Sequence, residues 1–161
     1  MKLLDHHALI KAAETNAFET LLALGSDVPD DTPAIMELKK FETVIVLAEH
    51  AKGLCAIADL AIPLCAPAEQ DATVVNADGL VQRCTPMGRV KGRAAPAWKI
   101  LGDVAAMMDR ELRYPGAAAV FNALATEVPF FAGMSHAAIP ATGAWGSGIT
   151  PPERKRLCTS R

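Results

Sequence analysis

Apolar runs of strand length recur along the first part of the chain, with helical or turn-rich segments between them. The run "FETLLALG" at 18–25 ends at a glycine, "FETVIVLAEH" at 41–50 repeats its opening, and "ADLAIPLCA" at 58–66 is a third such run. Continuously apolar strands are typical of a parallel sheet with right-handed crossovers and helices on both faces. The pattern therefore predicts an α/β fold with a partial parallel sheet and flanking helices.

Helix signals lie between these runs. Residues 3–14 place apolar positions at helical spacing. A second short helix is expected after Thr32, which suits an N-cap, with Pro33 at the first helical position and Lys39-Lys40 at the carbonyl end. Pro63 has no N–H to donate to a ladder, so the third run is expected at an edge of the sheet.

The second half of the chain follows another pattern. "TVVNADGLVQR" at 73–83 predicts a hairpin that turns at Asp78-Gly79, and two amphipathic helices are expected at 96–109 and 116–128. The Gly-, Pro- and Ser-containing end of the chain shows no period. We therefore expect an α/β domain over 1–139 and an irregular or disordered tail over 140–161.

Composition narrows the class of protein. A chain of 161 residues with 51% hydrophobic content is long enough for one core, and its net charge of −2 supplies no field for nucleic acid. No apolar stretch is long enough to span a membrane and the N-terminus lacks the apolar run of a signal peptide, so a cytoplasmic location is expected. The cysteines show no paired metal-ligand spacing, which predicts no zinc or iron–sulfur site in this chain: Cys55, Cys65, Cys84 and Cys158.

Residues that could carry chemistry are few. Gly25-Ser26 and Glu49-His50 follow the first two expected strands, where open α/β sheets bind ligands, but neither a dinucleotide fingerprint nor a P-loop is present. Neighbouring side chains on an extended chain point apart, so a direct Glu–His pair is not expected. A strand-ending turn is the favoured interpretation of Gly25-Ser26, and local chemistry is not favoured at Glu49-His50.

The remaining polar candidates also have a structural interpretation. Glu69 and Asp71 precede the hairpin and are interpreted as solvated loop acids, although acid–base work is conceivable there. The basic loop "GRVKGR" at 88–93 could hold a phosphate or could be merely soluble. The histidines are expected to be solvated or packed, and none is a predicted metal ligand: His6, His7 and His136.

The stretch at 58–83 carries a family resemblance. "ADLAIP", then "EQDAT", then "NADGLVQ" resemble the "ADVVLP…EKDGT…NxEGRVQ" signature of the molybdopterin oxidoreductase family. "WKILGDVAAMM" and "EVPFFAGMSHAAI" further along are similar to segments of the large molybdopterin-type subunit of bacterial NADH-quinone oxidoreductase, respiratory complex I. The similarity runs from about residue 8 to about 145 and implies a late part of a Rossmann-like domain in a much longer chain.

The resemblance implies a scaffold role. The matching residues are interpreted as turn and packing residues of the motif, with no catalytic or cofactor-binding role assigned: Asp59, Pro63, Glu69, Thr73, Asn76, Gly79 and Gln82. Gln70 and Leu80 replace the Lys and Arg of the family pattern, which removes two cations that could meet acidic groups or phosphates. No cofactor is therefore expected in this chain, and the iron–sulfur clusters of such a subunit are expected in its N-terminal region.

Three functions remain open. The main prediction is a scaffold segment of that large complex I subunit, which supports electron transfer from NADH to quinone without redox centres of its own. Its partners would be the other subunits of a membrane-associated complex, with no nucleic acid and no direct insertion, so a peripheral place on the inner membrane's cytoplasmic side also fits. The alternatives are a fragment of a formate dehydrogenase-like enzyme that binds a pterin nucleotide cofactor, and a truncated reading frame without function.

A scaffold segment is also expected to expose apolar surface. Parts of a longer family chain would cover it there, and exposed patches beyond a few hundred Å² normally mark an interface. The residues expected in this exposed set are Leu3, Leu4, Leu9, Ile10, Phe130 and Phe131.

Overall fold

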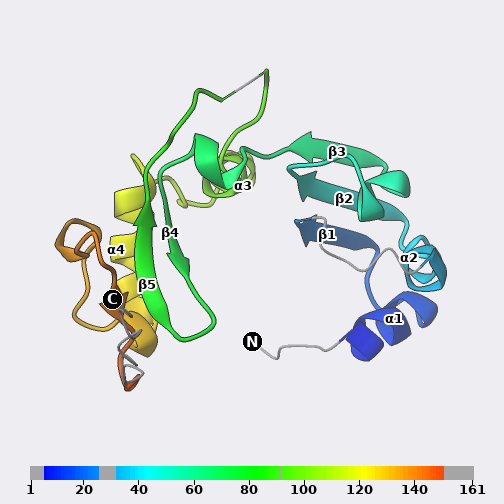
Figure 1. The fold of residues 1–161 in the computed structure, drawn as a ribbon. Coiled ribbons are helices and arrows are strands. Elements are labelled where there is room, and N and C mark those ends of the chain that lie inside the picture. Colours follow the sequence, from blue (N-terminus) through cyan, green and yellow to red (C-terminus); the bar gives the residue numbers. More distant parts are fainter. Residues whose placement is uncertain (1–5, 26–31, 91, 151–161) are drawn as a thin grey trace, which may run out of the picture.

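The computed structural model describes residues 6–25, 32–90 and 92–150. Its first half is a parallel sheet in the order β1-β2-β3, formed by Thr20–Leu24, Thr43–Ala48 and Leu60–Pro63. Leu22 pairs with Ile45, and Ile45 pairs with Leu60. The three apolar runs are thus the three strands, and the strand that contains Pro63 lies at the edge, as the sequence predicts (Figure 1).

Helices cover one face of this sheet. α1 (His6–Glu14), α2 (Thr32–Leu38) and the 3-10 turn η1 (Gly53–Ala56) surround a core that lies on the side chains of Val44 and Val46. Lys40 bonds to Glu37 after α2 and lies 4.0 Å from Glu14 of α1, which holds the two helices together at the surface. The side chain of the expected N-cap, Thr32, lies outside the described residues.

The opposite face of the sheet is covered only in part by the described residues, since Leu47 in the central strand is 1% exposed on that face. Leu22, Leu24 and Leu60 are 49%, 57% and 51% exposed, whereas Val46 on the covered face is 0% exposed. The described helices of the sheet core pack on the face of Val44 and Val46, so the flanking helices are confirmed, and helices on the second face stay a prediction. The apolar residues of the strands make both faces of the sheet suited to burial. They do not indicate which segment of the chain covers each face.

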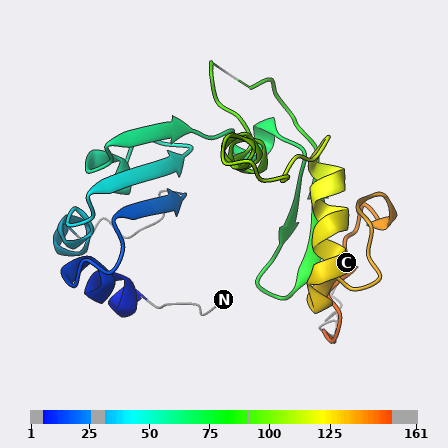
Figure 2. The same ribbon diagram turned by 180° about the vertical axis from the view of Figure 1, so that it is seen from behind.

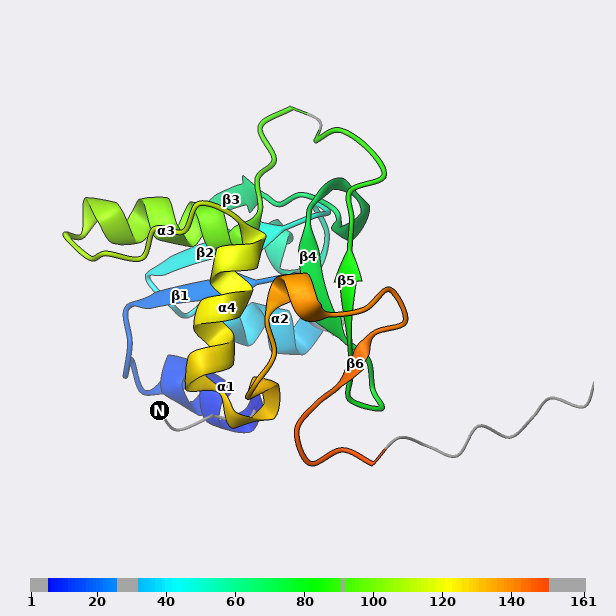
Figure 3. The same cartoon turned by 90° about the vertical axis from the view of Figure 1, so that its left-hand side faces the viewer.

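The second half is a hairpin packed on a helix. β4 (Ala72–Val75) and β5 (Leu80–Cys84) are antiparallel, and α4 (Ala117–Glu127) lies along them. β6 (Ala144–Trp145) adds to β5, so the prediction of an irregular tail from residue 140 is wrong at this strand. Figure 3 shows the hairpin strands running across the direction of the parallel sheet.

The core of the hairpin half contains aromatic contacts. Val81, Phe121 and Ile139 form its buried core, and two 3-10 turns, η3 (Pro129–Phe131) and η4 (His136–Ala138), fold against it. The rings of Phe121 and Phe131 meet edge to face with centroids 5.5 Å apart, a favoured geometry for aromatic pairs. The chain from α4 to β6 therefore wraps its own core.

α3 (Ala97–Met107) joins the two halves (Figures 1 and 2). A single parallel bridge between Leu64 and Ala95 attaches its start to the edge of β3. The apolar face that the sequence predicts for this helix is not buried, since Val104 and Met108 are 43% and 69% exposed. None of the described helices is long and apolar enough to cross a membrane.

Candidate functional site

The carboxyl ends of β1–β3 form one edge, where the polar candidates of the first half gather. Because the strands are parallel, Gly25, Glu49 and the segment after Pro63 follow them at the same edge. This edge points toward the hairpin half in Figures 1 and 2. Ligands of open α/β sheets bind outside such carboxyl ends.

The backbone at this edge leaves room for a ligand. Gly25 has a φ of +89° and donates its N–H to Leu47 O at 2.7 Å. Apart from its chain neighbours, no atom of the described residues lies within 4 Å of the position of a Cβ there. Glu49 and His50 are both exposed, and within the described residues no hydrogen bond or ion pair joins their side chains. Ser26, which follows Gly25, lies outside the described residues.

Two residues of the family motif hold the loops around β3. Asp59 accepts a hydrogen bond at its Oδ2 from the N–H of Val44 at 2.8 Å, which ties the start of β3 to β2. Glu69 accepts at Oε2 from the N–H of Ala66 at 3.1 Å and closes the 3-10 turn η2 (Pro67–Glu69). Carboxylates that accept backbone N–H bonds in this way position a loop rather than react.

The hairpin turn is organised by the next motif residues. The Oδ1 of Asn76 accepts from the N–H groups of Asp78 and Leu80, at 3.0 and 2.9 Å. Gly79 has a φ of +87°, in the left-handed region that favours glycine. Gln82 is paired with Val74 in the ladder. These contacts support a structural role for Asn76 and Gly79.

Gln70, which replaces the Lys of the family pattern, has a backbone partner. Its Nε2 donates to Cys65 O at 3.2 Å, so an amide here holds the loop between η2 and β3. Cys65 is 0% exposed, and burial, together with the negative charge of Glu69, raises the pKa of its thiol. The thiol is therefore poorly suited to act as a nucleophile or a metal ligand.

Asp71 and His136 meet, although the sequence places them 65 positions apart. His136 is 4% exposed, its backbone N–H donates to Asn122 Oδ1 at 2.8 Å, and its side-chain Nε2 lies 3.6 Å from Asp71 Oδ1. The prediction of a solvated loop acid is thus wrong for Oδ1 of Asp71, which is buried, although the side chain as a whole is 44% exposed. The sequence around His136 makes it look isolated because nothing local signals a partner.

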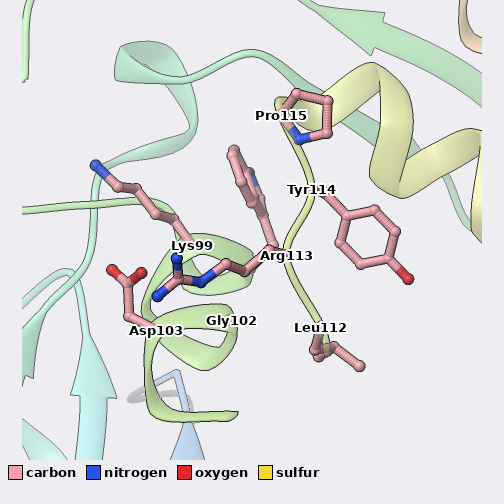
Figure 4. A pocket seen from close by; sticks show the side chains of 8 residues that line it. Lys99, Gly102, Asp103, Leu112, Arg113, Tyr114 and Pro115 are labelled. Carbon is pink, nitrogen blue, oxygen red and sulfur yellow. The ribbon is translucent and has the colours of Figure 1, made fainter. Parts of the chain in front are cut away.

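A surface hollow of about 360 Å³ lies between α3 and the segment before α4 (Figure 4). Lys99, Asp103 and Arg113 project toward the same side of it, and Tyr114 lies on the other side. The carboxylate of Asp103 offsets the two cations, so the hollow presents no concentrated positive charge for a phosphate. Of the basic loop, Arg89 and Arg93 are exposed, and Lys91 lies outside the described residues.

Across residues 6–25, 32–90 and 92–150, no three His, Cys, Asp or Glu side chains come together in a group that could hold a metal ion. His6 and His7 belong to α1, and their side chains lie outside the described set.

Comparison with known proteins identifies the family of this chain. Residues 4–107 match the family model of molybdopterin oxidoreductase, so the chain belongs to this family. It is 32% identical over 111 residues to F420-dependent formate dehydrogenase 2 subunit alpha of Methanococcus maripaludis, an alignment that covers 68% of this chain and 16% of that protein. It is 22% identical over 136 residues to a putative formate dehydrogenase of Staphylococcus aureus, covering 82% and 14% of the two chains.

These similarities confirm the family and leave the complex I branch, the finer prediction from the sequence, unconfirmed. These two relatives are a formate dehydrogenase subunit and a putative formate dehydrogenase, and they give no support to the large subunit of complex I. The chain spans only about a sixth of the length of these relatives. The signature at 58–83 identified the family because its residues build loops, and loop-building residues do not distinguish one branch of a family from another.

Proposed function

We propose that this chain is a segment of a molybdopterin-dependent oxidoreductase of the formate dehydrogenase kind. The observation that carries the proposal is the 32% identity to a formate dehydrogenase alpha subunit, together with an open carboxyl edge on β1–β3. In this proposal the edge holds the nucleotide end of a pterin cofactor. Bound metal on the pterin supplies the two-electron redox chemistry, and this chain binds and orients the cofactor.

The residues at the edge suit a nucleotide. Gly25 lets phosphate oxygens approach the backbone because no side chain stands in the way. Glu49 follows the next strand, 24 positions further on, and its exposed carboxylate can accept hydrogen bonds from ribose hydroxyls, as an acid in this place does in dinucleotide folds. Lys52, whose N–H donates to His50 O at 2.9 Å, adds a cation beside the same turn.

The test is a titration of the full, nitrogen-15-labelled chain with guanosine diphosphate, which presents a ribose and a pyrophosphate. We expect amide resonances of Gly25, Glu49 and His50 to shift. Glu49→Gln is expected to weaken binding by about tenfold, because a hydrogen bond to a charged group is worth about 1.5 kcal/mol or more.

Glu42→Gln is the matched control. Glu42 is also exposed, but it precedes β2 and therefore lies at the amino end of the strand. Its replacement changes the net charge by the same amount and is expected to leave the titration unchanged. Equal weakening by both variants, or shifts confined to amides away from the carboxyl edge, would contradict a nucleotide site there.

A scaffold role without a cofactor is the competing proposal. Its support is the replacement of the family Lys and Arg by Gln70 and Leu80, and Gln70 is indeed engaged in holding a loop. In that case the same titration would leave the amides of the carboxyl edge unshifted at millimolar nucleotide.

A further inference from the structure

The loop between β5 and α3 projects from the molecule. Figures 1 and 3 show both of its arms extending beyond the strands and helices of the two halves. We call its described residues, 85–90 and 92–95, the projecting loop, since Lys91 between them lies outside the described residues. Apart from chain neighbours, no atom of the described residues lies within 4 Å of the Cβ positions of Gly88 and Gly92. The tip is therefore open to a partner.

The base of the projecting loop is fixed at both ends. The N–H of Met87 donates to Ala68 O at 2.8 Å, next to the start of the hairpin. The N–H of Ala95 donates to Pro63 O at 3.3 Å, at the end of β3. A base held in this way lowers the entropy that the tip loses when it binds.

Cations gather in this part of the chain without acids to balance them. Residues 79–102 contain five basic residues and no Asp or Glu, although the whole chain has a net charge of −2. In the projecting loop Arg89 and Arg93 are exposed, and neither forms an ion pair with a carboxylate of the described residues. Guanidinium groups pair with carboxylates in planar, two-point contacts, so this surface suits an acidic partner.

Apolar side chains accompany the two arginines. Met87 is 87% exposed and Val90 is 41% exposed. Protein interfaces are enriched in Arg and Met, and their centres are apolar. Sites for single-stranded nucleic acid combine cations with aromatic platforms instead, and residues 85–95 contain no aromatic residue. The composition of the loop therefore favours a protein over a nucleic acid.

We propose that the projecting loop docks on a partner protein whose surface presents carboxylates around an apolar centre. Arg89 and Arg93 meet the carboxylates, and Met87 and Val90 meet the apolar centre. The docking needs no nucleotide at the carboxyl edge of β1–β3, so it can fail or hold separately from the proposed function.

The test uses the full chain and a fluorescent peptide of Asp and Glu residues with leucines at its centre. A matched peptide carries Asn and Gln in place of the acids. Fluorescence anisotropy at low salt is expected to show that the acidic peptide binds at least about tenfold more tightly than the neutral one, and that added salt weakens its binding. No measurable binding of the acidic peptide, or equal binding of the two peptides, would overturn the proposal.

Matched variants locate the contact. Arg89→Glu with Arg93→Glu is expected to weaken binding of the acidic peptide at least about tenfold. Arg110→Glu with Arg113→Glu makes the same change of net charge on exposed side chains after α3, and it should leave the affinity within about twofold. Met87→Gln removes an apolar contact and is expected to weaken binding about threefold.

Two competitors identify the class of partner. A single-stranded oligonucleotide and guanosine diphosphate are each added to the complex of the chain with the acidic peptide, and neither is expected to displace the peptide. Displacement by the oligonucleotide would assign the loop to nucleic acid, and displacement by guanosine diphosphate would assign it to the nucleotide site. Either result, or equal weakening by the two double variants, would overturn the docking of an acidic protein.

Discussion

The two halves of the molecule close their cores in different ways. The sheet half buries Val44, Val46 and Leu54 under α1, α2 and η1, but it leaves Leu22 and Leu60 on the other face about half exposed. The hairpin half wraps its core with its own chain, because η3, η4 and β6 return to the hairpin after α4. The contrast suggests that the hairpin half completes its own core, whereas the sheet half is suited to a further covering layer.

The largest expected loss of stability comes from placing a charge on the covered face of the sheet. Val46 is 0% exposed and belongs to the core under the helices. Val46→Asp should therefore cost about 3 kcal/mol or more and unfold the sheet half, since an unpaired charge would be buried. Urea denaturation followed by circular dichroism measures the loss.

Ile45→Asp sharpens the same comparison. The apolar run alone favours Ile45 as a position where a charge would unfold the domain. Ile45 is only partly buried, however, and pairs with the exposed Leu22 and Leu60 on the other face of the sheet. We expect a clearly smaller loss than for Val46→Asp, because the carboxylate can reach water. Equal losses for both variants would show that the second face is covered in solution.

The next effect tests how tightly the hairpin half is closed. A Cβ on Gly146 would overlap the ring of Phe130, which packs edge to face on Phe131 with centroids 4.9 Å apart. Gly146→Ala should therefore cost about 1–3 kcal/mol, the usual range for overpacking. Gly88→Ala is the control because nothing lies within 4 Å of its Cβ position. Thermal unfolding of both variants compares them, and an unchanged Gly146→Ala melting temperature would mean that this core is loosely closed.

A smaller effect concerns the hairpin turn. Asn76→Ala removes the oxygen that accepts hydrogen bonds from the backbone N–H groups of Asp78 and Leu80. It should lower the free energy of unfolding by only about 1 kcal/mol, because these exposed N–H groups can form hydrogen bonds with water instead. Asn76→Asp keeps an oxygen in place and should retain most of the stability. Hydrogen exchange of the Leu80 amide reports the difference, and equal exchange in all three proteins would show that the Asn76 side chain does not hold the turn.

The smallest effect is chemical and leaves stability unchanged. Burial, followed by the charge of Glu69, raises the pKa of the Cys65 thiol, so less of it is thiolate at any given pH. Iodoacetamide at pH 8 should therefore label Cys65 more slowly than the half-buried Cys55 and Cys84. Peptide mass spectrometry resolves the sites, and labelling of Cys65 at the rate of the other two would contradict its burial.

The sequence predicts local structure well where the signal is local. The three strands, the helices and the turn at Asp78-Gly79 follow from apolar runs, helical periods and turn residues, and each is present. β6 does not follow from the sequence because its two residues, Ala144 and Trp145, carry no alternating pattern and are strand only through pairing with β5.

In the candidate sites, too, the sequence reveals local contacts but not contacts between distant segments. Asp59 and Asn76 are recognisable through a motif, and their hydrogen bonds are short-range or join neighbouring strands. The contact of Asp71 with His136 joins the hairpin to the segment after α4, so only the folded chain reveals it.

The expected set of exposed apolar residues is wrong where the structure describes it. Phe130 and Phe131 pack in the hairpin core, and Leu9 packs against the sheet core. Leu3 and Leu4 lie outside the described residues. On the parallel strands the exposed apolar side chains are Leu22, Leu24 and Leu60. An apolar run in the sequence does not show which of its side chains the rest of the chain covers.

The most direct test of the contrast between the halves is hydrophobic dye binding with light scattering across a concentration series. We predict that the chain binds the dye strongly or self-associates through the exposed leucines of β1 and β3, and that Leu24→Lys with Leu60→Lys removes most of this signal. Met87→Lys with Met107→Lys is the control, because these side chains are 87% and 85% exposed but belong to none of the strands of the parallel sheet. A strictly monomeric wild-type chain without dye binding would contradict the account and indicate that the sheet half needs no further layer.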